Sequence, residues 1–304
     1  MNTKTKRIIM PVGLTLLLFS VSCSSSMTAF FKFLGRFQAG LSEKSVQVDN
    51  YKIAYLEGGK GETIVLVHGF GANKDNWTSF AKYLTKKYHV IVPDLPGYGD
   101  STRILTDNYG IDSQVTRLHG FVVNVGLKKF HIVGNSMGGF ISGKYAAKYP
   151  GEILSLGLFS PGGVKSPEES QLSVGLKEGR NALIIESTAD YDNLLNFIFV
   201  KPPSIPGPVK SYLAEKAVES KDFLKKVFPE IRSSSFDEAT MKNIRAKTLI
   251  LWGNKDQVLH VSGARVLEKR IKNSKVVIMQ ECGHAPMLER PEETANYYLD
   301  FIKL

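Results

Sequence analysis

One serine lies between small residues in the segment Gly134-Asn135-Ser136-Met137-Gly138. The segment follows an apolar, β-branched run at 131–133 and opens a helical pattern over 139–149. A strand, a tight turn and a helix in this order expose a serine hydroxyl at the carboxyl edge of a sheet, and the turn requires small neighbours. We therefore predict that Ser136 is a nucleophile for acyl transfer.

A serine at such a turn needs a histidine base and an acid, and both follow it in the chain. Of six histidines, only His260 and His284 do. His284 lies on a loop after the last expected strand and is the predicted base, whereas His260 lies at an expected helix start and is assigned a capping or surface role. Asp256 follows the run at 248–252 and is the predicted acid, because the preceding strand ends in Ser160-Pro161 without a carboxylate.

Two backbone N–H groups are expected to stabilise a developing oxyanion. They belong to Met137, directly after the nucleophile, and to Phe70, in a loop that follows an early strand. His68 and Asp94 precede the nucleophile in the chain. We therefore predict that His68 holds its loop by hydrogen bonds and that Asp94 organises a loop after another strand.

Apolar, β-branched runs alternate with amphipathic helical stretches after a hairpin at 46–55. The runs lie at 63–67, 89–92, 131–133, 154–159, 248–252 and 276–279. Continuous apolar strands separated by helices are typical of a parallel sheet covered on both faces. The sequence thus predicts an α/β fold, with a mostly parallel eight-stranded sheet flanked by helices.

The interval between Phe159 and Thr248 is much longer than the other intervals between strands. A structureless loop of this length is uncommon in a compact domain, so the interval predicts a helical cap inserted after the sixth strand. We place the cap at residues 164–243 and the core at 45–163 and 244–304.

The first 23 residues have the pattern of a targeting segment. Three cations, Lys4, Lys6 and Arg7, precede an apolar run over 8–21, which is short for a membrane span and ends near Cys23. Three outcomes stay open: lipidation of Cys23, ordinary cleavage, and an uncleaved anchor. Each predicts a location in the cell envelope or at a membrane. Residues 24–44 are expected to form an amphipathic tether that lies against lipid or folds back on the domain.

The chain is basic, with 39 Lys and Arg against 29 Asp and Glu and a net charge of +10. A basic face favours anionic lipid without specifying it. A basic stripe interleaved with aromatics is missing from the sequence, so nucleic-acid binding is not expected. We also expect no cofactor and no metal, since the sequence holds no metal-ligand cluster and no dinucleotide or phosphate-loop fingerprint. Cys23 and Cys282 are the two cysteines; for Cys282 a packing role and a thiol-sensitive role near the base are both considered.

Residues 45–304 resemble the lipases of the α/β-hydrolase fold, and among them bacterial lipoprotein lipases and membrane-anchored monoacylglycerol lipases. The similarity lies in the segments 73–77, 112–119, 201–203, 252–258 and 283–291, together with the serine turn. It implies the same triad of Ser136, Asp256 and His284, acylglycerol substrates, and attachment to a membrane at the N-terminus. The bulky Phe70 is similar to the residue found in hydrolases of medium- to long-chain acyl esters.

Two alternatives remain beside the carboxylic-ester hydrolase. Carbon–carbon bond hydrolases keep the serine on the same scaffold, and a non-catalytic ligand-binding homologue would have lost part of the triad. Haloalkane dehalogenases and epoxide hydrolases need an aspartate where Ser136 stands, so the sequence excludes them.

Overall fold

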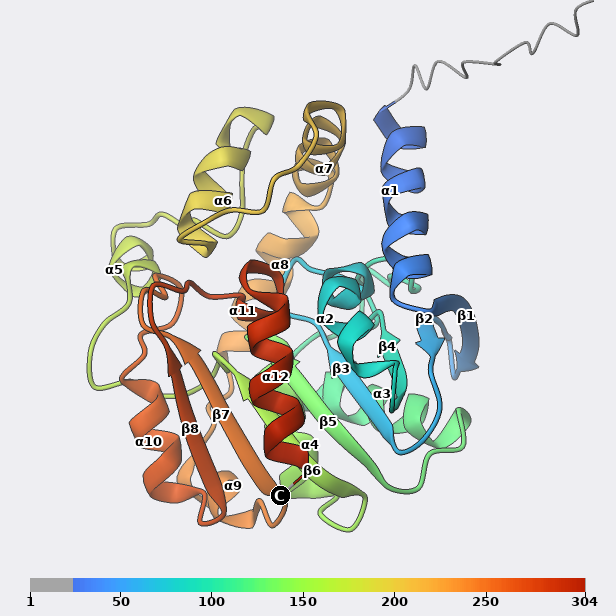
Figure 1. Ribbon diagram of the computed structural model, residues 1–304. Coiled ribbons are helices and arrows are strands. Elements are labelled where there is room, and N and C mark those ends of the chain that lie inside the picture. Colours follow the sequence, from blue (N-terminus) through green and yellow to red (C-terminus); the bar gives the residue numbers. More distant parts are fainter. Residues whose placement is uncertain (1–23, 304) are drawn as a thin grey trace, which may run out of the picture.

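An eight-stranded sheet forms the centre of the protein, in a computed structural model that describes residues 24–303 (Figure 1). The strand order is β1-β2-β4-β3-β5-β6-β7-β8. The strands are β1 (Leu41–Val48), β2 (Tyr51–Gly58), β3 (Thr63–Val67), β4 (His89–Pro93), β5 (Phe130–Asn135), β6 (Ile153–Phe159), β7 (Lys247–Gly253) and β8 (Ser274–Met279). β1 pairs antiparallel with β2, and β2 with β4, whereas all pairs from β4 to β8 are parallel. The predicted mostly parallel sheet is confirmed.

Each central strand is apolar on both faces because helices cover both. In β3, Val65 and Val67 belong to one buried cluster, and Ile64 and Leu66 belong to the other. Side chains of a strand alternate between the faces of its sheet, so a fully apolar strand is stable only between two helical layers.

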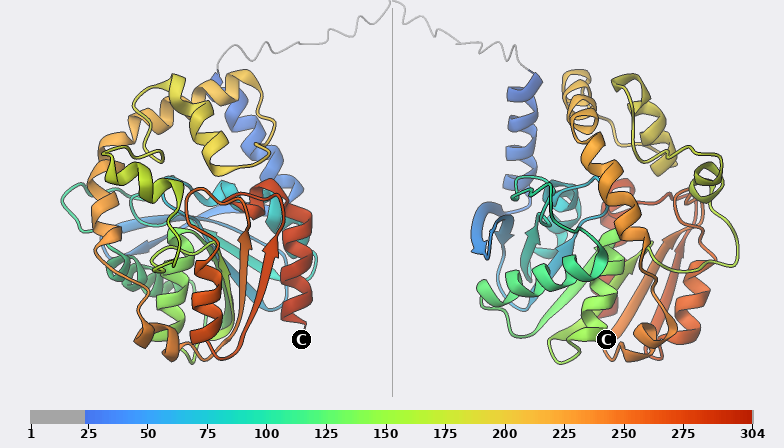
Figure 2. Two further views of the ribbon diagram at one scale, coloured as in Figure 1. Left: turned by 90° about the vertical axis from the view of Figure 1, so that its left-hand side faces the viewer. Right: turned by 180° about the vertical axis from the view of Figure 1, so that it is seen from behind.

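The two helical layers are seen on either side of the sheet in Figures 1 and 2. One cluster holds side chains of α2 (Thr78–Leu84), α11 (Pro286–Glu289) and α12 (Pro291–Ile302). The other holds side chains of α3 (Ile111–Asn124), α4 (Met137–Lys148), α9 (Glu238–Asn243) and α10 (Gly263–Arg270). Neither layer covers the carboxyl ends of the parallel strands.

The segment between β6 and β7 is helical, as the long interval predicted. It contains α5 (Gln171–Lys177), η2 (Thr188–Asp190), α6 (Tyr191–Ile198), α7 (Gly207–Glu219), α8 (Lys221–Arg232) and α9. The helices α5 to α8 lie over the carboxyl ends of the strands (Figures 1 and 2). In contrast, α9 packs against α4 and α10 of the core, so the end of this segment contributes to the core layer.

The N-terminal helix α1 (Ser24–Gln38) stands beside α7 and is followed at once by the sheet (Figure 1). Strand β1 begins at Leu41, so the expected start of the domain at Ser45 was too late. The prediction missed this because Leu41–Ser45 carries polar side chains on an edge strand, where no apolar pattern is required. The predicted signal segment and Cys23 lie outside the described residues. None of the helices formed by residues 24–303 has the length and apolar character needed to cross a bilayer.

Candidate active site

Ser136 occupies a strained turn between β5 and α4. Its backbone has φ 57° and ψ −122°, a conformation that a non-glycine residue adopts only when its surroundings impose it. A Cβ at Gly134 would lie 2.1 Å from the carbonyl oxygen of Gly138, and a Cβ at Gly138 would lie 2.2 Å from that of Val67. Both positions therefore require glycine, and the turn projects Ser136 beyond the end of β5.

His284 and Asp256 form a buried pair. The Nδ1 of His284 lies 2.8 Å from Oδ2 of Asp256, and each residue is 6% exposed. Asp256 follows β7, and its Oδ1 accepts the backbone N–H groups of Val258 and Leu259 at 2.8 and 2.9 Å. The indole Nε1 of Trp252 donates to Oδ2 at 3.0 Å. Three protein donors thus hold the carboxylate, so that it can orient the imidazole through Nδ1 and leave Nε2 as the proton acceptor.

The loop that carries His284 is fastened to the serine turn. The side-chain amide of Asn135, directly before Ser136, donates to the carbonyl oxygens of His284 at 3.0 Å and of Phe159 at 3.1 Å. Glu289 accepts the backbone N–H of Gly283 at 2.9 Å. Neither Asn135 nor Glu289 is among the site residues predicted from the sequence. The one sequence signal for Asn135 is its position directly before Ser136 in the motif at 134–138.

The two expected oxyanion donors come from separate segments next to Ser136. Met137 is the first residue of α4, where the helix dipole and the unpaired N–H groups favour negative charge. Phe70 belongs to the loop after β3, and a Cβ at the preceding Gly69 would lie 3.2 Å from Cβ of Ser136. This loop therefore approaches the serine as closely as a glycine allows.

His68 and His260 do not take part in the pair of His284 and Asp256. His68 is buried and holds its loop by hydrogen bonds, as predicted: one to the carbonyl oxygen of Gly69 at 2.8 Å, and one from the N–H of Leu95, in the loop after β4, at 3.0 Å. Burial lowers the pKa of His68. His260 lies 2.9 Å from the hydroxyl of Ser262 and also lines the cavity described next, a position that the sequence did not reveal.

A cavity of about 620 Å³ lies between the core and the inserted helices, with Ser136 and Met137 in its wall. This volume is in the range of pockets that enclose a small apolar ligand. Its apolar lining residues are Phe70, Ile111, Met137, Phe140, Val164, Leu172, Leu176, Leu183, Phe228, Ile231, Val258 and Leu259. Charged residues, Lys165, Glu168, Glu169 and Arg232, also line it. The arrangement suits a molecule with a long apolar part and a polar end.

Cys282 lies two residues before His284 and is fully buried. Burial and the nearby carboxylate of Glu289 raise the pKa of its thiol to about 12. The thiol is therefore protonated at neutral pH, which favours the packing role. Among residues 24–303, no group of three or more His, Cys, Asp or Glu side chains is arranged to hold a metal ion.

The sheet order, the serine turn and the His–Asp pair define a hydrolase scaffold, and comparison with known proteins identifies it. A family model described as alpha/beta hydrolase fold matches residues 62–173 and 171–291. The chain belongs to this family, and its relatives make it lipase- or esterase-like.

Three relatives illustrate the similarity. The chain is 38% identical to "Monoacylglycerol lipase abhd6-A" of Xenopus laevis over 281 residues, which cover 86% of this chain and 82% of that protein. It is 37% identical to "Lipase 1" of Psychrobacter immobilis, over 82% of this chain and 80% of that one. A crystal structure of a membrane phospholipase A, described as a bacterial virulence factor, is 44% identical and superposes with a TM-score of 0.91 over 92% of this chain and 91% of that one.

Proposed function

We propose that the protein hydrolyses carboxylic esters of medium- to long-chain acyl groups, such as monoacylglycerols, through an acyl-enzyme. The single observation that carries this proposal is the position of Ser136 in the wall of an apolar cavity, on a closely packed turn that requires glycine at 134 and 138 and holds Ser136 at a positive φ. The lipase relatives favour the same substrate class.

The proposed mechanism uses five residues. His284 accepts the proton of Ser136 as its hydroxyl attacks the ester carbonyl, and Asp256 stabilises the resulting imidazolium. The N–H groups of Phe70 and Met137 stabilise the oxyanion. His284 then protonates the leaving alcohol, and water, deprotonated by the same imidazole, attacks the acyl-enzyme to release the acid.

The helices α5 to α8 act as a cap in this proposal, whereas α9 belongs to the core layer. Leu172, Leu176 and Leu183 line the cavity from the segment between β6 and β7, and Phe70 packs edge-on against Phe228 at a centroid distance of 5.4 Å. The acyl chain would lie between these side chains and the core. The cap would therefore set the preferred chain length.

The experiment that tests this function measures hydrolysis of p-nitrophenyl esters from two to sixteen carbons, together with monoacylglycerols. Wild-type protein is compared with Ser136→Ala. The proposal expects a maximum at medium or long chains and no activity above background in the variant. Absence of esterase activity at every chain length in a folded protein would refute it, and turnover of a vinylogous diketone would then support the carbon–carbon bond hydrolase. Failure of a fluorophosphonate to label Ser136 would support a non-catalytic binding protein.

A phospholipid acyl ester is a second candidate substrate. Lys165 and Arg232 line the cavity and could neutralise a phosphate headgroup, and a membrane phospholipase A is among the relatives. Lysophosphatidylcholine should be compared with monoacylglycerol of the same acyl chain. Loss of activity on the phospholipid alone in Arg232→Gln would favour this candidate, whereas an equal effect on both substrates would count against it.

We also propose that the protein is held at a membrane of the cell envelope, as a lipoprotein modified at Cys23 or through an uncleaved N-terminal anchor. Helix α1 supports this proposal because it exposes apolar side chains and turns charged ones inward. Phe30, Phe33 and Phe37 are 57, 63 and 72% exposed, whereas the side chain of Arg36 is 16% exposed. Phenylalanines on one side of a surface helix are suited to the interface of a bilayer.

Vesicle co-sedimentation tests the contribution of α1. The chain from residue 24 onward should sediment with anionic phospholipid vesicles, and Phe33→Ser with Phe37→Ser should release it. The matched control is Val123→Ser, which removes an apolar side chain that is 58% exposed on α3. Equal binding of the double variant and wild type would contradict the role of this face.

A further inference from the structure

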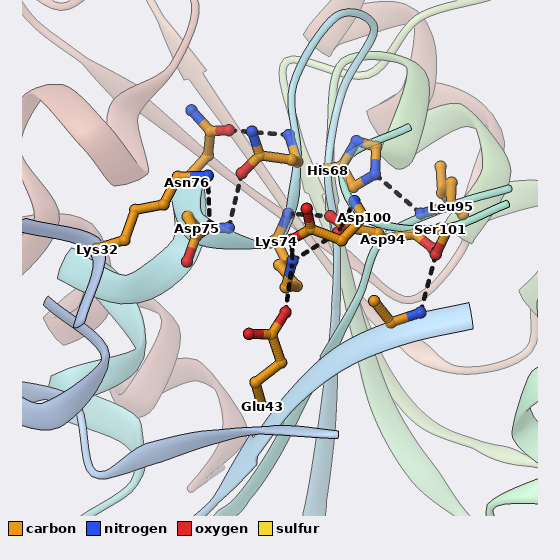
Figure 3. A network of polar contacts seen from close by, with 12 residues as sticks. Lys32, Glu43, His68, Lys74, Asp75, Asn76, Asp94, Leu95, Asp100 and Ser101 are labelled. Carbon is orange, nitrogen blue, oxygen red and sulfur yellow. Dashed lines mark hydrogen bonds and ion pairs between the residues drawn. The ribbon is translucent and has the colours of Figure 1, made fainter. Parts of the chain in front are cut away.

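A lysine and an aspartate, Lys74 and Asp94, are buried together in a network of polar contacts that also contains His68 (Figure 3). Lys74 begins the short helix η1 (Lys74–Trp77), and Asp94 directly follows β4. Both side chains are inaccessible, and Nζ of Lys74 lies 2.7 Å from Oδ2 of Asp94. Burying two charges is costly, and a buried ion pair is stable only where further hydrogen bonds satisfy both groups. The surroundings of this pair should therefore supply those hydrogen bonds.

The partners of Asp94 are complete. Its Oδ1 accepts the backbone N–H of Lys74 at 2.6 Å, and its Oδ2 accepts the backbone N–H of Asp100 at 2.8 Å. Burial alone would lower the pKa of Lys74, but Asp94 and Asp100 outweigh it and hold that pKa above its usual range. The lysine is therefore a permanent cation that fastens the loop after β3 to the loop after β4.

The loop after β4 in turn holds the imidazole of His68. The N–H of Leu95, next to Asp94, points at Nε2 of His68 at 3.0 Å, and Nδ1 of His68 lies 2.8 Å from the carbonyl oxygen of Gly69. A backbone N–H can only donate, so Nε2 is the acceptor and Nδ1 carries the proton. His68 is thus fixed as a neutral donor to the Gly69 carbonyl.

That carbonyl belongs to the same peptide unit as the N–H of Phe70. A trans peptide is planar, and its carbonyl and N–H point in opposite directions. A hydrogen bond that fixes the Gly69 carbonyl therefore also fixes the direction of the Phe70 N–H. The segment from His68 to Lys74 is held at both ends by Asp94 and Leu95.

We propose that Lys74, acting through Asp94, is a positioning residue for the oxyanion hole. The inference rests on the proposed function, because it takes the Phe70 N–H as an oxyanion donor. Lys74 touches no reacting atom; it keeps the peptide of Gly69 and Phe70 in the orientation that stabilises charge in the transition state. The effect of its removal should therefore fall on kcat rather than on KM.

The outer partners of Lys74 provide matched controls. Asp100 and Glu43, whose side chains are 57 and 43% exposed, also pair with Nζ of Lys74. Arg36 of α1 binds Glu43 and, through two hydrogen bonds of 2.6 and 2.9 Å, Asp75. The side chains of Asp100 and Glu43 pair with Lys74 and not with Leu95 or His68, so their removal leaves the inner chain of contacts in place.

The experiment compares Lys74→Met with Asp100→Asn in the full chain, using a p-nitrophenyl ester that the wild type hydrolyses and Ser136→Ala does not. Active sites are counted by titration with a fluorophosphonate, so that kcat refers to folded enzyme alone. We expect Lys74→Met to lower kcat by about tenfold or more, with KM within about twofold, because it misaligns a donor whose complete removal costs about 10²–10³. Asp100→Asn should stay within about twofold of wild type in both constants.

Two further variants separate positioning from stability. Leu267→Ala removes a buried side chain of α10 on the far side of the core; it should lower Tm and leave kcat per titrated site unchanged. If Lys74→Met does not fold, the isosteric Asp94→Asn carries the same expectation for kcat. A kcat per site equal to that of wild type in either folded variant would overturn the inference. An inactive wild type would instead refute the proposed function.

Discussion

The side-chain amide of Asn135 donates a hydrogen bond of 3.0 Å to the carbonyl oxygen of His284. Asn135 immediately precedes Ser136, and its amide also binds the carbonyl oxygen of Phe159 at the end of β6. One side chain thus ties the candidate nucleophile turn to the loop of the candidate base. Both hydrogen bonds of this buried side chain are donated by its amide nitrogen.

Replacing Asn135 with alanine should separate the two loops. The buried carbonyl oxygen of His284 would lose its donor, whereas that of Phe159 keeps the backbone N–H of Ser136 at 3.0 Å. A buried acceptor left unsatisfied costs about 1–3 kcal/mol, and we expect kcat on a p-nitrophenyl ester to fall about tenfold or more. Asn124→Ala is the control, because that amide makes an exposed bond of 2.8 Å to Gly120 within α3. If both variants keep wild-type kcat and Tm, the Asn135 bond does not position the site.

Asp256→Asn should leave the fold intact and remove most of the activity. The asparagine can keep an acceptor for the N–H groups of Val258 and Leu259, but it can present an N–H to His284 and favour the wrong tautomer. A loss of about 10⁴-fold in kcat is expected by analogy with serine triads. A loss of less than about tenfold, measured on the preferred ester, would remove Asp256 from the catalytic role.

Cys282 should not react with thiol reagents in the folded protein. With a pKa raised to about 12 by burial, only about 10⁻⁴ of the thiol is ionised at pH 8. In a Cys23→Ser background, N-ethylmaleimide should label Cys282 only after denaturation, with mass spectrometry as the readout. Rapid labelling of the native protein at pH 8 would contradict this assignment.

The same raised pKa gives a pH dependence of stability. The folded state favours the neutral thiol, so its contribution is complete below the ordinary pKa and is lost as pH rises toward 12. The difference in unfolding free energy between wild type and Cys282→Ala should therefore shrink between pH 9 and pH 11. Denaturant titrations at each pH measure it, and a constant difference would oppose the prediction.

Leu176→Trp should shorten the preferred acyl chain. Leu176 lines the cavity from α5, and the larger indole would occupy space that we assign to the acyl group. We expect the ratio of kcat/KM for a four-carbon ester to that for a twelve-carbon ester to rise about tenfold. Val174→Trp is the control, since Val174 lies on the same helix and is 37% exposed. An unchanged ratio in Leu176→Trp would place the acyl chain elsewhere.

The fold could be predicted from the sequence because its signals are local. Apolar runs such as 63–67 and the glycines around Ser136 specify strands and a turn over a few residues. The order of nucleophile, acid and base, together with positions directly after expected strands, then selected Asp256 and His284, which the structure brings within 2.8 Å of each other.

The supports of the site could not be predicted because they depend on contacts between distant residues. Asn135 and His284 are separated by 149 positions, and nothing in the local sequence of either indicates the other. Lys74 stands beside Asp75 in the sequence with no local signal of burial, and only the packing of two loops buries it. Helix α1 places its phenylalanines outward because Arg36 is bound by Asp75, an orientation that helical periodicity alone does not give.

The measurement that tests the central claim most directly is covalent labelling by a fluorophosphonate, followed by peptide mapping. The account predicts one adduct, on the peptide that contains Ser136, formed much more slowly in His284→Ala and absent in Ser136→Ala. An adduct that persists in Ser136→Ala, or a folded wild type that forms none, would contradict the assignment of Ser136 as the nucleophile.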